Sequence, residues 1–292
     1  MKNRNIVKQN YQLVNAKYKL NTSEIKFIMT AIAQINMDDD ELKGYEIKVS
    51  ELEDKLQVEQ NETRLKQFAK KLMSKPLEVP TEDGWAIYNW FSKIEYVRGQ
   101  AKFRVNIHKD LKPYLLDLKK RFVKYNLKYI LPLTSNYSIR IYQLLKEYEK
   151  LTKRTFTVKE LQELLQVPKS LKIYANFKNK VLKVAEKELL ENCDIYFEFE
   201  EIKEGRRVNE ILFRIKKNKW LNEDQQTLIG TEIDENLKQY IDKKFYMQGY
   251  TWIILSISQI DKNNFQVFVR DVDDKTYTKT FDISRAQLQA AK

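Results

Sequence analysis

Apolar residues in the first 220 positions follow helical and strand-like spacing in an order that occurs twice. They recur every three or four positions within Ile25–Ile32 and again within Ile139–Leu145, and this spacing predicts an amphipathic helix in each stretch. Each helix is followed by two further helical stretches and then by alternating apolar and polar residues, the pattern of half-buried strands. Helix, helix-turn-helix and hairpin is the order of a winged-helix domain, so the pattern predicts two such domains.

A ten-residue phrase marks the second helix of both predicted domains. Residues 49–58 (VSELEDKLQV) and 158–167 (VKELQELLQV) share six identities at one offset, and the same offset places Phe68 and Lys71 opposite Phe177 and Lys180. The alternating residues that follow are Phe103, Val105 and Ile107 in the first copy, and Ile195, Phe197 and Phe199, then Ile211, Phe213 and Ile215, in the second. Two copies of one supersecondary unit explain this arrangement better than two unrelated domains.

The excess positive charge lies within the repeated region. The formal net charge of the 292 residues is +12, and it divides into +8 for residues 1–128, +6 for residues 129–219 and −2 for residues 220–292. A basic character confined to the repeated domains is typical of a protein that binds a polyanion such as nucleic acid.

The third predicted helix of each domain has a polar face opposite its apolar stripe. Amide, hydroxyl and ammonium groups on such a face can hydrogen-bond base edges in a major groove or hold phosphates. Basic residues at the hairpin turns would act as wings that reach the DNA backbone or the minor groove. The candidate DNA-binding residues are Lys172, Asn176, Asn179, Lys180 and Lys183 with wing residues Lys203, Arg206 and Arg207 in the second domain, and Thr63, Arg64, Gln67, Lys70 and Lys71 with wing residues Arg98 and Lys102 in the first. Ordinary solvated surface is the alternative interpretation of each group taken alone.

The residues of common enzyme sites are sparse. No two of the six glycines are close enough to form a phosphate-binding loop or a dinucleotide fingerprint. His108 is the only histidine and Cys193 the only cysteine, which argues against a paired-His metal site, a catalytic Ser-His or Cys-His arrangement and a disulfide. The acidic clusters Asp38–Glu41 and Asp271–Asp274 could hold Mg²⁺, but both resemble solvated turns. We therefore expect no catalytic residues, metal site or cofactor.

The C-terminal segment, residues 220–292, has a different character. A helical stretch around Glu232–Phe245 precedes three strand-like runs at Thr251–Ile257, Phe265–Val269 and Lys275–Phe281. The pattern predicts a helix with a three-strand meander. Its role is open between a protein-binding module, a dimerisation element and an accessory nucleic-acid sheet, and the net charge argues against the last.

Several ordered motifs lie within residues 5–216, at Val7–Asn10, Leu13–Leu20, Tyr125–Leu131, Ser135–Leu145, Asn176–Leu182 and Gly205–Val208. Together these segments resemble the theta-type plasmid replication initiators of the Rep_3 or RepB class. The resemblance implies binding to directly repeated origin sites called iterons, opening of the adjacent AT-rich duplex and loading of the host replicative helicase. It also implies that the second domain makes the main base contacts through residues 172–183, and that the first contributes dimerisation and backbone contacts.

We therefore expect an α+β protein with two tandem winged-helix domains, at residues 1–128 and 129–219, followed by a small α+β segment at 220–292. The expected function is that of a sequence-specific plasmid replication initiator. No apolar run approaches the length of a membrane span and the start of the chain lacks the apolar stretch of a signal peptide, so we expect a cytoplasmic protein.

The expected partners are double-stranded DNA, with origin iterons and the gene's own operator as candidate sites, host replicative helicase and initiator proteins, and a second copy of the chain in a homodimer. Two alternative functions remain open: a winged-helix transcriptional repressor without initiation activity, and a Mg²⁺-dependent DNA nuclease.

Overall fold

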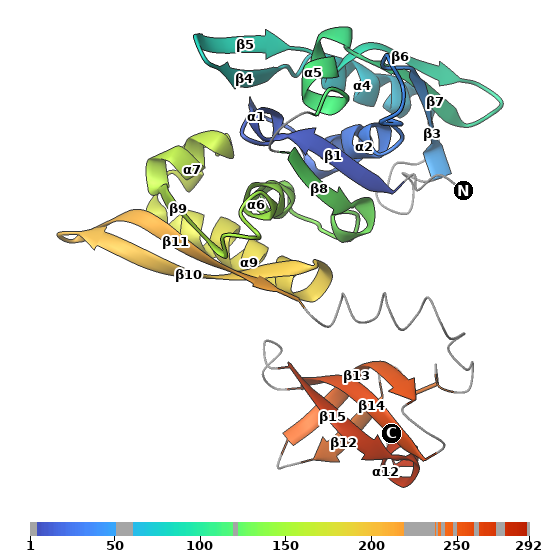
Figure 1. The fold of residues 1–292 in the computed structure, drawn as a ribbon, viewed down its shortest axis with the longest axis vertical. Helices are drawn as coiled ribbons and strands as arrows, with labels where there is room; N and C mark the ends of the chain where they lie inside the picture. Colours follow the sequence, from blue (N-terminus) through green and yellow to red (C-terminus); the bar gives the residue numbers. More distant parts are fainter. Residues whose placement is uncertain are drawn as a thin grey trace. The chain divides into compact units, whose positions relative to one another are not determined.

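The computed structural model describes most of the chain, which divides into two compact units, Met1–Asn218 and Lys219–Lys292. The described residues are 5–50, 61–118, 122–218, 237, 239–240, 243–247, 250–259, 263–272 and 278–290. The first unit holds two winged-helix domains, and the second holds a small antiparallel sheet with a helix (Figure 1).

The first winged-helix domain combines short helices with small antiparallel sheets. Its helices are α1 (Tyr11–Val14), α2 (Thr22–Ile32), α4 (Glu62–Met73) and α5 (Lys112–Leu115), with 3-10 turns at Lys109–Leu111 and Leu127–Tyr129. Its strands are β1 (Ile6–Asn10), β2 (Lys17–Tyr18), β3 (Gly44–Lys48), β4 (Leu77–Thr81), β5 (Gly84–Tyr88), β6 (Phe91–Val97), β7 (Lys102–Ile107) and β8 (Phe122–Asn126). The strand orders are β3-β7-β6, β2-β4-β5 and β1-β8.

Phe27 is the centre of the first core. It is fully buried on α2, and its ring lies 5.3 Å from that of Phe68 on α4, 5.7 Å from Phe91 on β6 and 5.4 Å from Phe103 on β7, each edge to face. Edge-to-face packing is a favourable geometry for aromatic pairs. These contacts fix α4 on the hairpin of β6 and β7, so its opposite face is left to solvent.

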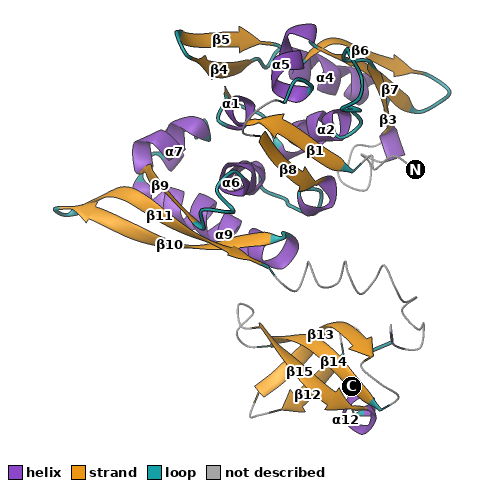
Figure 2. Ribbon diagram, viewed as in Figure 1, coloured by secondary structure: helices purple, strands orange, loops and turns teal. Residues whose placement is uncertain are grey.

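The second winged-helix domain has the same order of helices followed by a hairpin as the first. Its helices are α6 (Asn136–Lys146), α7 (Val158–Leu164), α8 (Tyr174–Phe177) and α9 (Lys183–Asn192), with a 3-10 turn η3 (Lys169–Leu171) and a π-helical turn η4 (Lys178–Leu182) between them. Its strands are β9 (Lys153–Thr157), β10 (Ile195–Glu204) and β11 (Arg207–Lys217), in the order β10-β11-β9. Figure 2 shows helix α9 behind the strands β10 and β11, and α6 packs against α9.

The internal repeat is confirmed in three dimensions. Strands β3 and β9 end directly before Val49 and Val158, the first residues of the repeated phrase. Each strand pairs with the second strand of its hairpin, with Ile47 opposite Phe103 on β7 and Phe156 opposite Ile211 on β11. The amphipathic helices predicted upstream are α2 and α6. Of the helix expected from the first phrase, Val49 and Ser50 are helical, and residues 51–60 lie outside the described residues.

The two copies differ by a hairpin of β4 and β5 inserted between α4 and β6 of the first domain. The sequence pattern did not predict this hairpin. Its β5 strand is at the edge of the sheet β2-β4-β5, and Trp85 and Ile87 on that strand are 67% and 57% exposed. An edge strand with large exposed apolar residues is a surface on which another chain can pair.

Arg140 joins the two winged-helix domains. The residue is buried on α6, and its guanidinium donates to the carbonyl oxygens of Val14 (3.0 Å) and Ala16 (2.9 Å) in the first domain. It also stacks 4.1 Å over the ring of Tyr18, and it donates to Gln143 Oε1 at 3.0 Å. Burial raises the pKa of the Tyr18 hydroxyl, against the opposing effect of Arg140.

A buried polar network continues the contact between the domains. Gln143 Nε2 on α6 donates to the hydroxyl of Tyr125 (2.8 Å) on β8, and Tyr18 donates to Gln143 Oε1 (3.3 Å). Arg154 of β9 donates to Asn15 Oδ1 at 2.9 Å. Because these buried groups satisfy one another across the junction, the two domains are held as one unit.

The C-terminal unit is a four-stranded antiparallel sheet. The strands β12 (Lys244–Met247), β13 (Tyr250–Gln259), β14 (Asn264–Asp271) and β15 (Thr278–Ser284) pair in chain order, and helix α12 (Arg285–Gln289) follows. Its core contains Trp252, Phe265, Val267, Phe281 and Leu288.

The predicted strand runs correspond to β13, β14 and β15, but the prediction of only three strands was wrong. Lys244 and Phe245, placed at the end of a helix by their spacing, belong to a fourth strand that pairs with β13, where Phe245 lies opposite Trp252 and both of these side chains enter the core. Most of the helix expected over Glu232–Phe245 lies outside the described residues.

Candidate nucleic-acid interface

The polar face predicted for the third helix of the second domain is exposed. Segments α8, η4 and α9 follow one another without a break, and their fully buried side chains are Phe177, Val181, Leu182, Ala185 and Leu189. The exposed side chains of these segments include the predicted Asn179, Lys180 and Lys183, together with Lys187; the predicted Lys172 is also exposed but precedes α8, at the end of η3. The side chains of Asn179 and Lys180 form no hydrogen bond or ion pair with any other described residue. These two side chains are free to meet a ligand.

Asn176 has a contact within the protein. Its Nδ2 donates to the carbonyl oxygen of Ser170 at 3.0 Å, and its side chain is half-buried. Gln162 on α7 donates to the carbonyl oxygens of Leu171 and Lys172, at 3.3 and 3.2 Å. These amide groups satisfy the backbone of the turn between α7 and α8, and so fix where the helix begins.

The tip of the β10–β11 hairpin carries the predicted wing residues Lys203, Arg206 and Arg207, and all three are exposed. Gly205 has a φ of +60°, which a glycine adopts without strain, and this closes the turn. A shift of register after Ile202 marks a bulge, which bends the strand just before the tip.

Two basic residues along the hairpin, Arg214 and Lys216, are paired with acids, unlike those at its tip. Arg214 donates twice to Glu200, at 2.6 and 3.1 Å, and Lys216 pairs with Glu198. The Arg214 hydrogen bonds lower the pKa of the Glu200 carboxyl. The hairpin's basic side chains that form no ion pair with a described residue are therefore those at the tip and Lys217 at the end of β11.

Glu201 ties the third helix to the wing. Its Oε1 accepts from Lys178 Nζ at 2.7 Å and from the Tyr174 hydroxyl at 2.9 Å. The hydrogen bond from Lys178 lowers the pKa of the Glu201 carboxyl, while partial burial and then the carboxylate raise the pKa of Tyr174. No sequence pattern pointed to this brace, because Tyr174 and Glu201 are 27 residues apart.

The equivalent helix of the first domain, α4, also exposes its predicted face. Asn61 caps the helix by accepting from the backbone N–H of Thr63, and Leu65 and Leu72 are buried. The predicted residues Thr63, Arg64, Gln67, Lys70 and Lys71 are all exposed. The last two lie in the final turn of the helix, where cations also favour the helix dipole.

The predicted wing residues of the first domain are engaged with carboxylates. Arg98 donates to both oxygens of Glu62 on α4, at 2.9 and 2.6 Å, and Lys102 pairs with Glu46 at 2.8 Å. The Lys102 side chain is only 18% exposed. Arg98 and Lys102 can contact DNA only by giving up these ion pairs. Lys70 and Lys71, in contrast, form no ion pair with a described residue.

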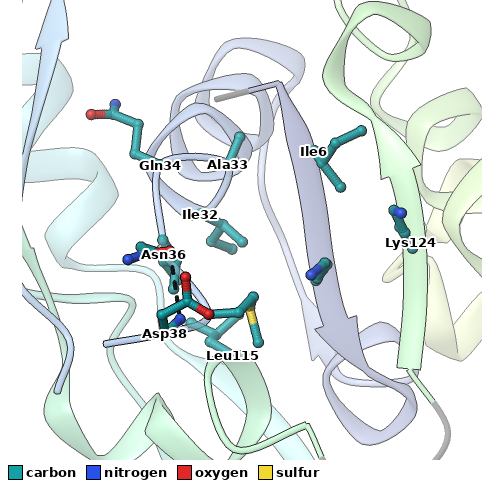
Figure 3. A pocket seen from close by; sticks show the side chains of 11 residues that line it. Ile6, Ile32, Ala33, Gln34, Asn36, Asp38, Leu115 and Lys124 are labelled. Atoms are coloured by element: carbon teal, nitrogen blue, oxygen red, sulfur yellow. Dashed lines mark hydrogen bonds between the residues drawn. The ribbon is translucent and has the colours of Figure 1, made fainter. Parts of the chain in front are cut away.

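A pocket of about 530 Å³ lies on another part of the first domain. Figure 3 shows Ile32, Asn36, Asp38 and Leu115 around it, with Ile6 and Lys124 on the neighbouring strands. Lys124 on β8 lies opposite Lys8 on β1 in the register of these two antiparallel strands, and both residues line the pocket. The lining contains none of the predicted DNA-binding residues.

The other residues considered as candidates for catalysis or metal binding are His108, Cys193 and the two acidic clusters. His108 Nδ1 accepts from the backbone N–H of Asp110 at 3.4 Å, as expected of a cap, and Cys193 is buried. Asp39 of the first acidic cluster pairs with Lys43 at 2.6 Å. Part of the second cluster, residues 273–274, lies outside the described residues. Within the described ranges, no three His, Cys, Asp or Glu side chains are grouped to hold a metal ion, and no helix is long and apolar enough to cross a membrane.

Two family models match the part of the chain that forms the winged helices. The model described as Initiator Replication protein, WH1, matches residues 6–146, and the model described as Initiator Rep protein, WH2, matches residues 157–215. Together they cover more than half of the chain. The chain belongs to the initiator replication protein family. The resemblance drawn from the sequence motifs is thereby confirmed.

A curated relative and a solved structure agree with this family. The initiator is 25% identical over 238 residues to a protein of Escherichia coli described as a replication initiation protein. The alignment covers 77% of this chain and 72% of the relative. It is also similar to the crystal structure of the Pi initiator protein in complex with iteron DNA, with a TM-score of 0.61 and 19% identity, covering 75% of this chain and 99% of that chain. The initiator shares the fold of that protein.

Proposed function

We propose that the initiator binds iterons, directly repeated sequences in the origin of a plasmid, and thereby starts replication of that plasmid. The observation that carries this proposal is the exposed set Asn179, Lys180 and Lys183 on a helix braced to the wing that ends in Arg206 and Arg207. Amide and ammonium groups on a helix suit base edges in a major groove, and guanidinium groups at a wing tip suit phosphates or the minor groove. The fold shared with the Pi initiator, which was crystallised with iteron DNA, supports the same role.

The first domain contributes backbone contacts in this proposal. The exposed Lys70 and Lys71 lie on the helix equivalent to the reading helix, and their charges are not neutralised by a described acid. Since ammonium groups act on phosphate as point charges, these contacts add affinity with little sequence preference.

The initiator acts by binding, without covalent chemistry. Bound protein assists the opening of the adjacent AT-rich duplex and recruits the host replicative helicase and host initiator proteins. Since the proposed target is plasmid DNA, the proposal includes a cytoplasmic location.

A homodimer is part of the proposed function. The exposed Trp85 and Ile87 on the β5 edge suit strand pairing with a second copy of the chain. Sedimentation velocity of the intact protein and of Trp85→Lys tests this: the substitution is expected to shift the population towards monomer. An unchanged distribution removes β5 from the interface.

DNA binding is tested by selection. The intact protein is incubated with a randomised duplex library, and the bound duplexes are sequenced and compared with the DNA beside the gene. The expected outcome is a consensus that recurs there as direct repeats spaced by about two helical turns. Binding without any consensus contradicts the proposal.

The repressor alternative shares the DNA-binding site and needs a separate test. A plasmid that carries only this gene and the repeat-containing DNA is introduced into a host in which its marker cannot otherwise replicate. Stable maintenance supports initiation, and loss of the plasmid together with repression of the gene's own promoter supports the alternative.

A further inference from the structure

The reading helix of the second domain contains a widened turn. Between α8 and α9, residues Lys178–Leu182 form the π-helical turn η4, in which the backbone N–H of Lys183 donates to the carbonyl oxygen of Lys178, five residues earlier. An α-helix uses donors and acceptors four residues apart, so the wider turn accommodates one additional residue. Single π-turns within α-helices occur frequently at functional sites.

The spacing of the buried positions along the sequence also indicates one additional residue. The fully buried positions are Phe177, Val181, Leu182, Ala185 and Leu189, separated by four, one, three and four residues. A helix with one apolar face has spacings of three, one, three and four, as in a heptad pattern. The sequence therefore departs from the ideal stripe by one residue, and the departure lies between Phe177 and Val181, within the segment where the π-turn forms.

The extra residue lies on the exposed side. Asn179 and Lys180 are the exposed residues of η4, and Val181 and Leu182 at its end both enter the core. Widening the turn lets both apolar residues stay buried and makes the backbone bulge at Asn179 and Lys180. Lys178, at the start of the turn, is held by Glu201 of the wing strand at 2.7 Å. The bulge is thus anchored on one side by the core and on the other by the wing.

We propose that this π-turn is a specificity-determining device: it holds Asn179 and Lys180 outward from the helix so that they read base edges, while Lys178 and Glu201 position the turn. The inference rests on the proposed DNA binding and adds which residues of the helix select the sequence. An exposed amide can donate to and accept from one base at the same time, and an ammonium can donate to guanine. Lys187, a full turn beyond η4 and exposed, serves the phosphate backbone.

The extra residue makes the inference testable by deletion. Removing Asn179 restores the three-one-three-four spacing of the buried residues, so the helix can close as a regular α-helix with the same core. The deletion variant is expected to fold with an unfolding midpoint equal to or above that of the intact protein. It is also expected to retain binding to a scrambled duplex, since Arg206 and Arg207 at the wing tip remain.

The experiment compares four proteins: intact initiator, the Asn179 deletion, the double variant Asn179→Ala/Lys180→Ala, and Lys187→Ala as the control. Each is used to select duplexes from one randomised library, and its affinity is measured for the intact protein's consensus and for a scrambled duplex. Circular dichroism and thermal unfolding are recorded for each.

The deletion and the double variant are both expected to lose the preference for the consensus by about tenfold or more, with little change on scrambled DNA. Lys187→Ala is expected to weaken both duplexes equally and to keep the consensus. A folded deletion variant that selects the same consensus with the same preference overturns the proposal, as does a double variant that keeps it.

The remaining outcomes are also decisive. An unfolded deletion variant shows that the residue is not an insertion, which overturns the role given to the π-turn. If the intact protein selects no consensus at all, the proposed DNA function fails first and the inference fails with it.

Discussion

The guanidinium of Arg140 lies 4.1 Å over the ring of Tyr18, and this stacked pair connects the first helix of one winged-helix domain to a strand of the other. Both residues are buried, and Nη2 of the guanidinium donates to two first-domain carbonyl oxygens while Nη1 donates to Gln143 Oε1. This contact between the domains is made by a charge that has no carboxylate partner among the described residues. The relative position of α4 and of the α8–α9 segment, the two helices proposed to contact DNA, depends on this contact.

Replacement of Arg140 by Met is expected to destabilise the first unit by roughly 2 to 4 kcal/mol, because it leaves the buried carbonyls of Val14 and Ala16 without a donor. Urea unfolding at neutral pH measures the change. Arg207→Met at the exposed wing tip is the matched control and should leave the unfolding free energy within about 0.5 kcal/mol. A loss of stability no larger for Arg140→Met than for the control contradicts the role given to Arg140.

The contact between Lys178 and Glu201 predicts a pH dependence. Because the pKa of Glu201 is lowered in the folded protein, its contribution to stability is fully present above the unfolded value of about 4.5 and is lost as the pH falls through the lowered pKa. Glu201→Gln should therefore be less stable than the intact protein at pH 7, and the difference should shrink below pH 4.5. Thermal unfolding between pH 3 and pH 7 measures this, with exposed Glu163→Gln as the control. A difference that stays constant over the range contradicts it.

The third helix of the second domain is expected to contact bases, and α4 of the first domain is expected to contact phosphates. Asn179→Ala and Lys183→Ala should each cost about 1 to 3 kcal/mol on the consensus and relax sequence preference. Lys70→Ala with Lys71→Ala should weaken all duplexes similarly and reduce the slope of log K against log salt by about 0.9 for each phosphate that the variant no longer neutralises. Salt titrations with consensus and scrambled duplexes distinguish the two effects. An unchanged slope in the lysine variant means that α4 does not touch phosphates.

The C-terminal unit is expected to be dispensable for DNA binding. A protein ending at Asn218 retains both winged helices, the buried contacts of Arg140 and every candidate DNA-binding residue. Its affinity for the consensus duplex should equal that of the full chain within about threefold, which corresponds to less than about 1 kcal/mol. Anisotropy titrations with both proteins provide the measurement. A folded truncated protein with much weaker binding would assign residues 219–292 to the DNA interface.

The sequence was sufficient for those features that depend on local periodicity. The repeated phrase and the apolar stripes of α2, α6 and the hairpins predicted two winged helices, because a residue's burial within one helix or strand recurs at that element's own period. The same periodicity placed Lys70, Lys71, Lys180 and Lys183 on exposed faces. Phe245 is where local spacing failed, since it continues a helical pattern but is paired in a strand opposite Trp252.

Only the tertiary structure decided which exposed groups are free and which are already engaged. Arg98 and Lys102 look like wing residues in the sequence, yet they are bonded to Glu62 and Glu46, which are 36 and 56 residues away. The brace at Glu201 depends in the same way on residues distant in the chain. Whether a charge is neutralised depends on which side chains the fold brings within a few ångströms of it, and that distance does not follow from the spacing of residues along the chain.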